Sequence, residues 1–175
     1  MKIKPIYLIG PRGAGKSTIA RLLGARLEQP FFDQDHIFES RYGSIPALFK
    51  RRTRSWIVNC LAQTLDEVEP GDIVAVSGSS LLDEGTINVK RCAQVRRGTV
   101  ILLLPGGDHK KNIEILYRRE RARKSYVADK DTSSRNYHDR LPIYQSLANH
   151  VVHSAEKPEM TVDRIVRVLS RHRRI

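Results

Sequence analysis

The stretch that decides the fold is residues 7–28, YLIGPRGAGKSTIARLLGARLE. An apolar run ends at Gly10, a glycine-rich loop follows, and apolar residues then recur at helical spacing after Lys16. Residues 10–17 match the pattern G-x(4)-G-K-[ST] in full, between a predicted strand and a predicted helix. In this context the pattern forms a phosphate-binding loop, so the sequence predicts nucleoside triphosphate binding.

Each residue type in this loop has a physical reason to be there. Glycines let backbone N–H groups approach an anion closely, and the helix N-terminus adds a partial positive charge. Lys16 brings a full charge to the β- and γ-phosphates, and Ser17 offers a hydroxyl to Mg²⁺. We therefore expect ATP and Mg²⁺ as cofactors. The expected nucleotide-binding residues of the loop are Gly13, Ala14, Gly15, Lys16, Ser17 and Thr18.

The remainder of the chain has the pattern of an α/β fold. Its 175 residues, 40% hydrophobic and 29% charged, suit one compact domain over residues 1–175. Short apolar runs alternate with helix-like segments, as in a parallel sheet covered by helices. The expected strands are Ile6–Gly10, Phe31–Asp33, Ile73–Val76, Val100–Leu104 and His150–Val152. The expected helices are Lys16–Leu27, one through Ile57, Leu61 and Leu65 that ends at Pro70-Gly71, Ile113–Arg123 and Thr161–Leu169.

The chain is strongly basic, with a net charge of +12 from 31 Lys and Arg against 19 Asp and Glu. This charge favours anionic partners such as nucleotide phosphates, acidic metabolites or nucleic acid. Aromatic residues make up 6% of the chain, too few for a surface on which bases stack, which argues against nucleic acid.

Other bulk features indicate where the protein works. No apolar run approaches the ~20 residues that span a bilayer, and no N-terminal signal segment is visible. Cys60 and Cys92 match no metal or redox spacing. We expect a cytoplasmic protein without membrane association, acting on a small anionic or polyol substrate as a monomer or weak dimer.

A pair of carboxylates follows the second predicted strand. In Phe31-Phe32-Asp33-Gln34-Asp35 the two aspartates stand at i and i+2 as the strand ends. Both can lie on one side of the strand, at the carboxyl edge where ligands bind in open α/β sheets. One carboxylate can order Mg²⁺-bound water, and the other can face a substrate hydroxyl.

A polar segment, Ser125–Asp139 (SYVADKDTSSRNYHD), lacks a clean hydrophobic period. A stretch this polar inside a compact domain is often a mobile lid rather than part of the core. We expect a lid over about residues 119–139 that closes over the bound substrates.

At these motifs the chain resembles the shikimate kinase family. The corresponding stretches are GPRGAGKST at 10–18, DQD at 33–35, VSGSS at 76–80 and RLPIY at 140–144, in the family's order over nearly the whole chain. The loop and the D-x-D are shared with gluconate-kinase-like enzymes, whereas R-x-P-x-Y is more particular to the shikimate kinase type. The resemblance implies a three-layer P-loop kinase fold, with a five-stranded parallel sheet in the order 2-3-1-4-5 flanked by helices.

The resemblance also implies roles for the residues that handle phosphate. Lys16 would contact the transferring phosphoryl group, Ser17 would ligate Mg²⁺, and Asp33 would hold that ion through water. An arginine at the start of the lid, Arg119 or Arg123, would reach the nucleotide or its phosphates.

On the acceptor side, the resemblance implies three further roles. Asp35 would hydrogen-bond the acceptor hydroxyl and assist its deprotonation. Gly78 would bring backbone close to the substrate ring. Arg140 would pair with the substrate carboxylate, a bidentate geometry that suits arginine.

The acceptor side departs from the family pattern in two places. The family's glycine triplet reads Gly78-Ser79-Ser80, so side chains are expected to line the substrate pocket and change its polarity. The family's F-R-x-x-E signature is missing, with Trp56 and Asn59 where its arginine and glutamate belong. Arg54 is the candidate replacement for that arginine. Trp56 is either a core residue or a stacking platform for a ring-shaped acceptor.

Three functions are compatible with these residues. The first is a kinase that phosphorylates shikimate, through Mg²⁺, Lys16 and a lid arginine. The second is a kinase for another acceptor, such as a gluconate-like sugar acid, another polyol or a nucleoside-like compound. The third is a basic nucleotide-binding module without catalysis.

Overall fold

A computed structural model describes residues 3–83, 85–122, 129–154 and 157–172 of the chain. Its centre is a five-stranded parallel sheet in the order β2-β3-β1-β6-β7. These strands are β1 (Ile6–Ile9), β2 (Phe31–Asp33), β3 (Ile73–Ala75), β6 (Thr99–Leu104) and β7 (His150–His153). Counted along the chain within this sheet, they lie in the order 2-3-1-4-5. The labels jump because β4 (Leu82–Asp83) and β5 (Thr86–Ile87) form a separate antiparallel pair that we did not predict.

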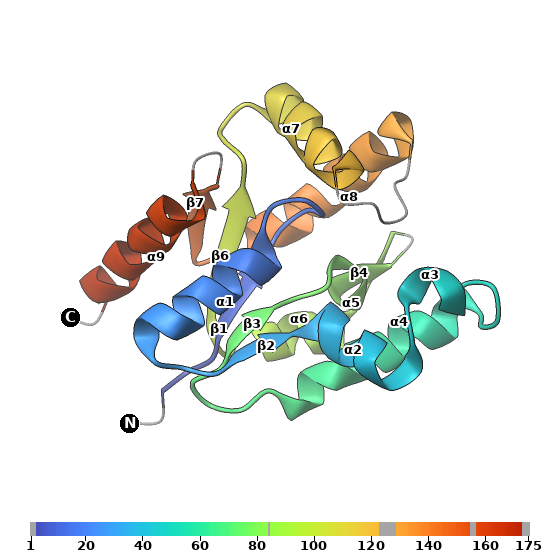
Figure 1. The fold of residues 1–175 in the computed structure, drawn as a ribbon, viewed down its shortest axis with the longest axis horizontal. Coiled ribbons are helices and arrows are strands. Elements are labelled where there is room, and N and C mark those ends of the chain that lie inside the picture. The colour runs from blue at the N-terminus through green and yellow to red at the C-terminus, as the bar shows by residue number, and fades with distance from the viewer. Residues whose placement is uncertain (1–2, 84, 123–128, 155–156, 173–175) are drawn as a thin grey trace.

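Helices cover both faces of this sheet, as Figure 1 shows. Helix α1 (Lys16–Leu27) packs against α9 (Pro158–His172) and against β2 and β3. Helix α8 (Lys130–Leu147) contacts β6 and α7 (His109–Arg121). The remaining helices are α2 (Gln34–Tyr42), α3 (Ile45–Leu48), α4 (Arg54–Gln63), η1 (Thr64–Glu67), α5 (Gly78–Leu81) and α6 (Val89–Val95).

The central strands are apolar along their whole length because the sheet is covered on both sides. Every residue of β1 is buried, and so are Val100–Leu104 of β6. The predicted strands and the predicted helix Lys16–Leu27 are therefore confirmed, with strand ends that differ by one residue. Within the described residues, no helix is long and apolar enough to cross a membrane.

The polar segment Ser125–Asp139 is corrected in part. Residues from Lys130 onward belong to α8, whose first turn is capped by Asp129 through a 2.8 Å bond from the Thr132 backbone N–H. The buried residues of α8 are Tyr137, Leu141, Tyr144 and Leu147. Only Tyr137 lies inside Ser125–Asp139, so this segment by itself does not show the helical spacing of the buried residues. Residues 123–128, with the expected site residue Arg123, lie outside the described part of the chain.

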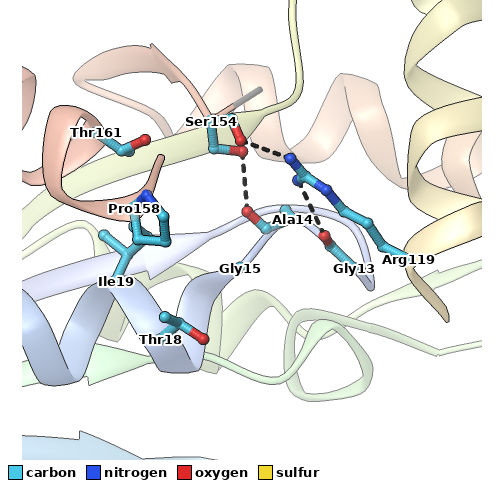
Figure 2. A pocket seen from close by; sticks show the side chains of 9 residues that line it. All are labelled: Gly13, Ala14, Gly15, Thr18, Ile19, Arg119, Ser154, Pro158 and Thr161. Carbon is cyan, nitrogen blue, oxygen red and sulfur yellow. Dashed lines mark hydrogen bonds between the residues drawn. The ribbon is translucent and has the colours of Figure 1, made fainter. Parts of the chain in front are cut away.

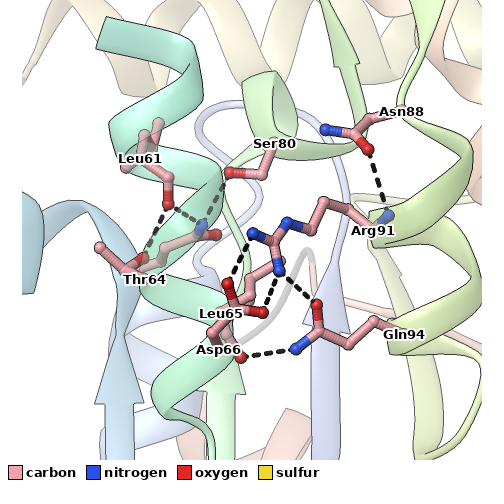
Figure 3. A network of polar contacts seen from close by, with 9 residues as sticks. Leu61, Thr64, Leu65, Asp66, Ser80, Asn88, Arg91 and Gln94 are labelled. Carbon is pink, nitrogen blue, oxygen red and sulfur yellow. Dashed lines mark hydrogen bonds and ion pairs between the residues drawn. The ribbon is translucent and has the colours of Figure 1, made fainter.

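An ion pair between a buried arginine, Arg91, and a half-exposed aspartate, Asp66, joins η1 to α6 (Figure 3). The Arg91 side chain is 5% exposed, and its guanidinium binds both carboxylate oxygens of Asp66, with Nη2 2.9 Å from Oδ2. Arg91 also donates to Gln94 Oε1 at 2.7 Å, and Gln94 donates to the Leu65 carbonyl at 2.6 Å. Hydrogen bonding from Arg91 lowers the pKa of Asp66. The network fixes the segment between α4 and β3.

We predict that Asp66→Asn destabilises the fold by about 1 kcal/mol at pH 7, because it leaves the buried Arg91 without a counter-charge, while the 55% exposure of the Asp66 side chain lets solvent screen the pair. The pKa of Asp66 is lowered on folding, so its contribution is present above the unfolded-state pKa of about 3.9 and is lost as the pH falls through the folded-state pKa. The free-energy difference between wild type and variant, measured by urea unfolding, should therefore shrink below about pH 4.

The neighbouring residue supplies a matched control. Glu67 pairs with Arg41 at 2.5 Å, but both side chains are more than 40% exposed. Because exposed pairs contribute about 0–1 kcal/mol, Glu67→Gln should have a small effect. Equal losses for the two variants, or a loss from Asp66→Asn that does not change with pH, would contradict the prediction.

Candidate active site

The phosphate loop connects β1 to α1 and is held in shape by its own groups. Gly15 precedes α1 with φ +94°, in the left-handed region that favours glycine. The Lys16 ammonium donates to the carbonyls of Gly10 at 2.9 Å and Pro11 at 3.2 Å. The lysine therefore folds back over the loop, where its charge is available to a phosphate.

A pocket lies beside this loop, between α1, α7 and the start of α9 (Figure 2). Arg119 of α7 donates to the Ser154 carbonyl at 2.8 Å and the Gly13 carbonyl at 3.4 Å, and the Ser154 hydroxyl donates to the Ala14 carbonyl at 3.0 Å. These bonds tie the loop to the segment after β7. The lining residues are Gly13, Ala14, Gly15, Thr18, Ile19, Arg119, Ser154, Pro158 and Thr161. The predicted nucleotide residues Gly13, Ala14, Gly15, Thr18 and Arg119 thus line one pocket.

Thr161 is a pocket residue that the sequence analysis did not single out. It is 1% exposed, and its hydroxyl has no hydrogen-bond partner among the described residues. A buried hydroxyl without a partner is costly, and such groups call for an explanation. A threonine in an amphipathic helix such as α9 carries no sequence signal that separates a pocket residue from a core residue.

The two aspartates after β2 are placed by different elements. Asp33 ends the strand, and its carboxylate caps α2 by accepting a 3.3 Å bond from the His36 backbone N–H. We expected Asp35 at the exit of the strand, but it stands in the first turn of α2. The Asp33 cap is the local cause, because Asp is a favoured N-cap residue.

Asp35 lies where the phosphate loop and the acceptor side meet. Protein surrounding its carboxyl raises the pKa of Asp35, with smaller upward effects from Asp33 and Glu39, whereas Lys16 and the Ser77 hydroxyl lower it. More than a third of the residue is still open to solvent, which moderates the effect of burial. A raised pKa makes this carboxylate a better proton acceptor.

Gly78, Arg140 and Tyr144 lie against one another. A Cβ atom added to Gly78 would lie 2.5 Å from the Tyr144 hydroxyl and 2.6 Å from Arg140 Nη1, both on α8. Tyr144 is 1% exposed, and burial raises its pKa, while Arg140 lowers it and Asp35 raises it. The structure thus brings together Asp35, Gly78 and Arg140. Tyr144 belongs to the RLPIY stretch, but we had assigned it no role.

Two expectations about the altered triplet and signature are revised. The Ser80 side chain is fully buried, and its hydroxyl oxygen accepts a 2.7 Å bond from Gln34 Nε2. Trp56 packs against the small core cluster around Phe38 and Ile57. Its ring also meets the Tyr42 ring edge-on at 5.5 Å, which supports the core interpretation.

Arg54, the candidate replacement for the missing arginine, stands at the start of α4. Its guanidinium is ion-paired with Asp83 of β4, with Nη2 2.6 Å and Nε 2.9 Å from the same carboxylate oxygen. Asp83 therefore offsets the positive charge that Arg54 would bring to a substrate carboxylate.

Comparisons with known proteins agree with this geometry. The profile described as shikimate kinase matches residues 12–170. A shikimate kinase of Ralstonia nicotianae is 30% identical over 164 residues, which cover 89% of this chain and 81% of that protein. One from Chromohalobacter salexigens is 31% identical over 170 residues, or 93% of this chain and 89% of that protein. The solved shikimate kinase from Acinetobacter baumannii in complex with shikimate shares the fold, with a TM-score of 0.77 at 22% identity, covering 97% of this chain and 94% of that chain.

We predict that Thr161→Val weakens binding of ATP and ADP by roughly five- to tenfold, because the isosteric change removes a hydroxyl that a nucleotide would satisfy. The same change should leave the ligand-free protein as stable as wild type or slightly more stable, since it removes an unpartnered buried hydroxyl. Calorimetric titration and thermal unfolding measure the two effects separately.

Thr161→Ser is the matched control, because it keeps the hydroxyl and should keep nucleotide affinity. An unchanged dissociation constant in Thr161→Val would show that the hydroxyl does not face the nucleotide. A loss of affinity in both variants would assign the effect to packing.

Proposed function

The chain belongs to the shikimate kinase family, and from this premise we propose that it transfers the γ-phosphoryl group of ATP to a hydroxyl group of shikimate. One observation supports this best. Asp35 interacts with Lys16 of the phosphate loop on one side and with Ser77 and Tyr144 of the acceptor side on the other. A carboxylate in that position can accept a hydrogen bond from the hydroxyl group of the acceptor and hold that group next to the bound nucleotide.

The reaction follows from this arrangement. The acceptor hydroxyl hydrogen-bonds to Asp35, its oxygen attacks the γ-phosphorus of ATP, and the bond to the ADP oxygen breaks. The proton passes to Asp35, whose raised pKa favours this step. Lys16 turns from the loop carbonyls to the phosphoryl oxygens and stabilises the charge that they carry. Catalysis is thus chiefly positioning and charge neutralisation.

The residues present fit a magnesium ion that arrives with the nucleotide. Ser17 and Asp33 offer a hydroxyl and a carboxylate oxygen, and Mg²⁺ prefers such hard ligands while retaining water and substrate phosphates. Within the described residues, no group of three or more His, Cys, Asp or Glu side chains is arranged to hold a metal alone. When bound, the ion would neutralise charge on the β- and γ-phosphates.

Arg140 is the cation that we assign to the acceptor carboxylate. It stands against Gly78, whereas Arg54 is paired with Asp83. The second candidate is an acceptor that needs less positive charge in its binding site, such as a polyol or a sugar acid bound in another orientation. The Arg54–Asp83 pair favours this candidate, because Asp83 offsets the charge of Arg54.

Other expectations accompany this proposal as predictions. Arg119 would contact the nucleotide from its place in the pocket, and Arg123 would act from the lid over residues 119–139. A cytoplasmic location, a monomeric or weakly dimeric state and the absence of nucleic-acid partners also stay predictions.

The test is an acceptor panel with ADP release as the readout. We expect magnesium-dependent turnover with shikimate, much less with its neutral methyl ester, and little with gluconate. Lys16→Ala and Asp35→Asn should each lower kcat on the order of 10³-fold, because each removes a charge that acts on the transferring group or the acceptor. Turnover with gluconate above that with shikimate would favour the second candidate, and full activity of Lys16→Ala would exclude the mechanism.

We predict that Gly78→Ala raises KM for the acceptor by roughly tenfold, a change of about 1.4 kcal/mol, and leaves KM for ATP within twofold. The added methyl would displace the ends of Arg140 and Tyr144, which stand within 2.6 Å of its position. Steady-state kinetics at varied acceptor and varied ATP separate the two constants. An equal rise in both constants would contradict the prediction.

A further inference from the structure

Gln34 is a fully buried polar residue between the two aspartates. Its side chain makes hydrogen bonds to three partners on two other segments. Nε2 donates to the Leu61 carbonyl at 2.7 Å and to the Ser80 hydroxyl oxygen at 2.7 Å, and Oε1 accepts from the Ser77 backbone N–H at 2.8 Å.

These partners determine the orientation of the amide. Ser77 N–H can only donate and the Leu61 carbonyl can only accept, so the reversed amide would set like groups against each other at both ends. An amide is therefore required here: a carboxylate has no donor for Leu61, and an apolar side chain satisfies neither partner.

Two of the three segments that Gln34 joins carry groups that we assign to the acceptor site. Its own backbone carries Asp35, the next residue, at the start of α2. Ser77 interacts with Asp35 and precedes Gly78, which packs against Arg140 and Tyr144. Leu61 lies on α4, the helix that begins with Arg54.

We propose that Gln34 is a positioning residue of the phosphoryl-transfer reaction, which holds the Ser77–Gly78 turn and α4 in a fixed relation to Asp35. The inference rests on the proposed function, since it assigns to Gln34 the geometry between the acceptor and its proton-accepting carboxylate. Small displacements of such groups lower reaction rates strongly.

Two partners of Gln34, Leu61 and Ser80, lie beside the polar network around Thr64 and Arg91 (Figure 3). The Leu61 carbonyl also accepts a 2.8 Å bond from the Thr64 hydroxyl. The η1 segment that follows is held by the Arg91 pair with Asp66 and by Gln94. A buried side chain whose partners are themselves fixed can transmit a defined position to the site.

Gln34 also explains the altered triplet. Ser80 stands at the third position of Gly78-Ser79-Ser80, and its hydroxyl oxygen accepts a hydrogen bond from the Gln34 amide. Glycine at this position would leave the second Gln34 N–H without that partner. Gln34 and Ser80 thus form a buried hydrogen-bonded pair next to Asp35 and Gly78.

The experiment compares Gln34→Met, which keeps length and removes all three bonds, with Thr64→Val, which removes a bond to the same Leu61 carbonyl. We expect Gln34→Met to lower kcat/KM for the acceptor by 10- to 100-fold while KM for ATP stays within twofold. Thr64→Val should lower Tm with kcat/KM for the acceptor unchanged within twofold. An effect of Gln34→Met on both substrates alike, or a loss in Thr64→Val as large, would overturn the proposal.

Ser80→Ala keeps the test decisive if Gln34→Met does not fold. Ser80→Ala alone should lower kcat/KM for the acceptor about threefold. If Gln34→Met does fold, adding Ser80→Ala to it should cause no further loss. A wild-type value of kcat/KM for the acceptor in Ser80→Ala, or additive losses in the double variant, would contradict a shared role of Gln34 and Ser80.

A ligand-free measurement separates this inference from the proposed function. Hydrogen exchange of the Ser77 amide should accelerate at least tenfold in Gln34→Met and stay unchanged in Thr64→Val. If wild type does not phosphorylate shikimate, the proposed function fails, and the variants are then compared on whichever acceptor the panel identifies. Unchanged exchange at Ser77 would overturn the positioning role itself.

Discussion

The site depends on one constraint, the register of three parallel strands at their carboxyl ends. Asp33 of β2 pairs with Ala75 of β3, and Ala75 pairs with Leu8 of β1, so these residues lie in one row across the sheet. Two residues beyond that row come Asp35, Ser77 and Gly10. Asp35, Ser77 and the start of the phosphate loop therefore lie equally far along the chain beyond the carboxyl edge of the sheet, because backbone hydrogen bonds fix where each strand ends.

Buried polar side chains complete what the register begins. Gln34 and Arg91 are both buried, and each satisfies backbone or side-chain groups of segments that do not belong to the sheet. Apolar packing is non-directional, so it brings α4, η1 and α5 together without fixing their relative position to a fraction of an ångström. Hydrogen bonds between buried groups are directional and costly to lose, so they supply the missing precision.

The parts of the fold that sequence predicted well are those governed by local rules. The phosphate loop carries a full motif, α1 has apolar residues at helical spacing, and each of the five strands contains a short apolar run. Helix α8 was obscured because its first turns are polar and its buried face begins at Tyr137. Gln34 and Thr161 could not be identified, because their importance lies in partners, or in a missing partner, that only the tertiary structure brings together.

The two halves of the site differ in how they are built, and this decides where the protein departs from its family. The nucleotide half is made chiefly from backbone N–H groups and glycines, so its chemistry follows from the motif alone. The acceptor half is made from side chains on separate elements, and some of them are paired with neighbouring residues. Arg54 forms an ion pair with Asp83, and Ser80 is hydrogen-bonded to Gln34. Replacing a residue in this half therefore alters the residue paired with it as well. The sheet and the phosphate loop do not depend on these pairs, and under the proposed function Arg140, which lies against Gly78, would recognise the acceptor carboxylate.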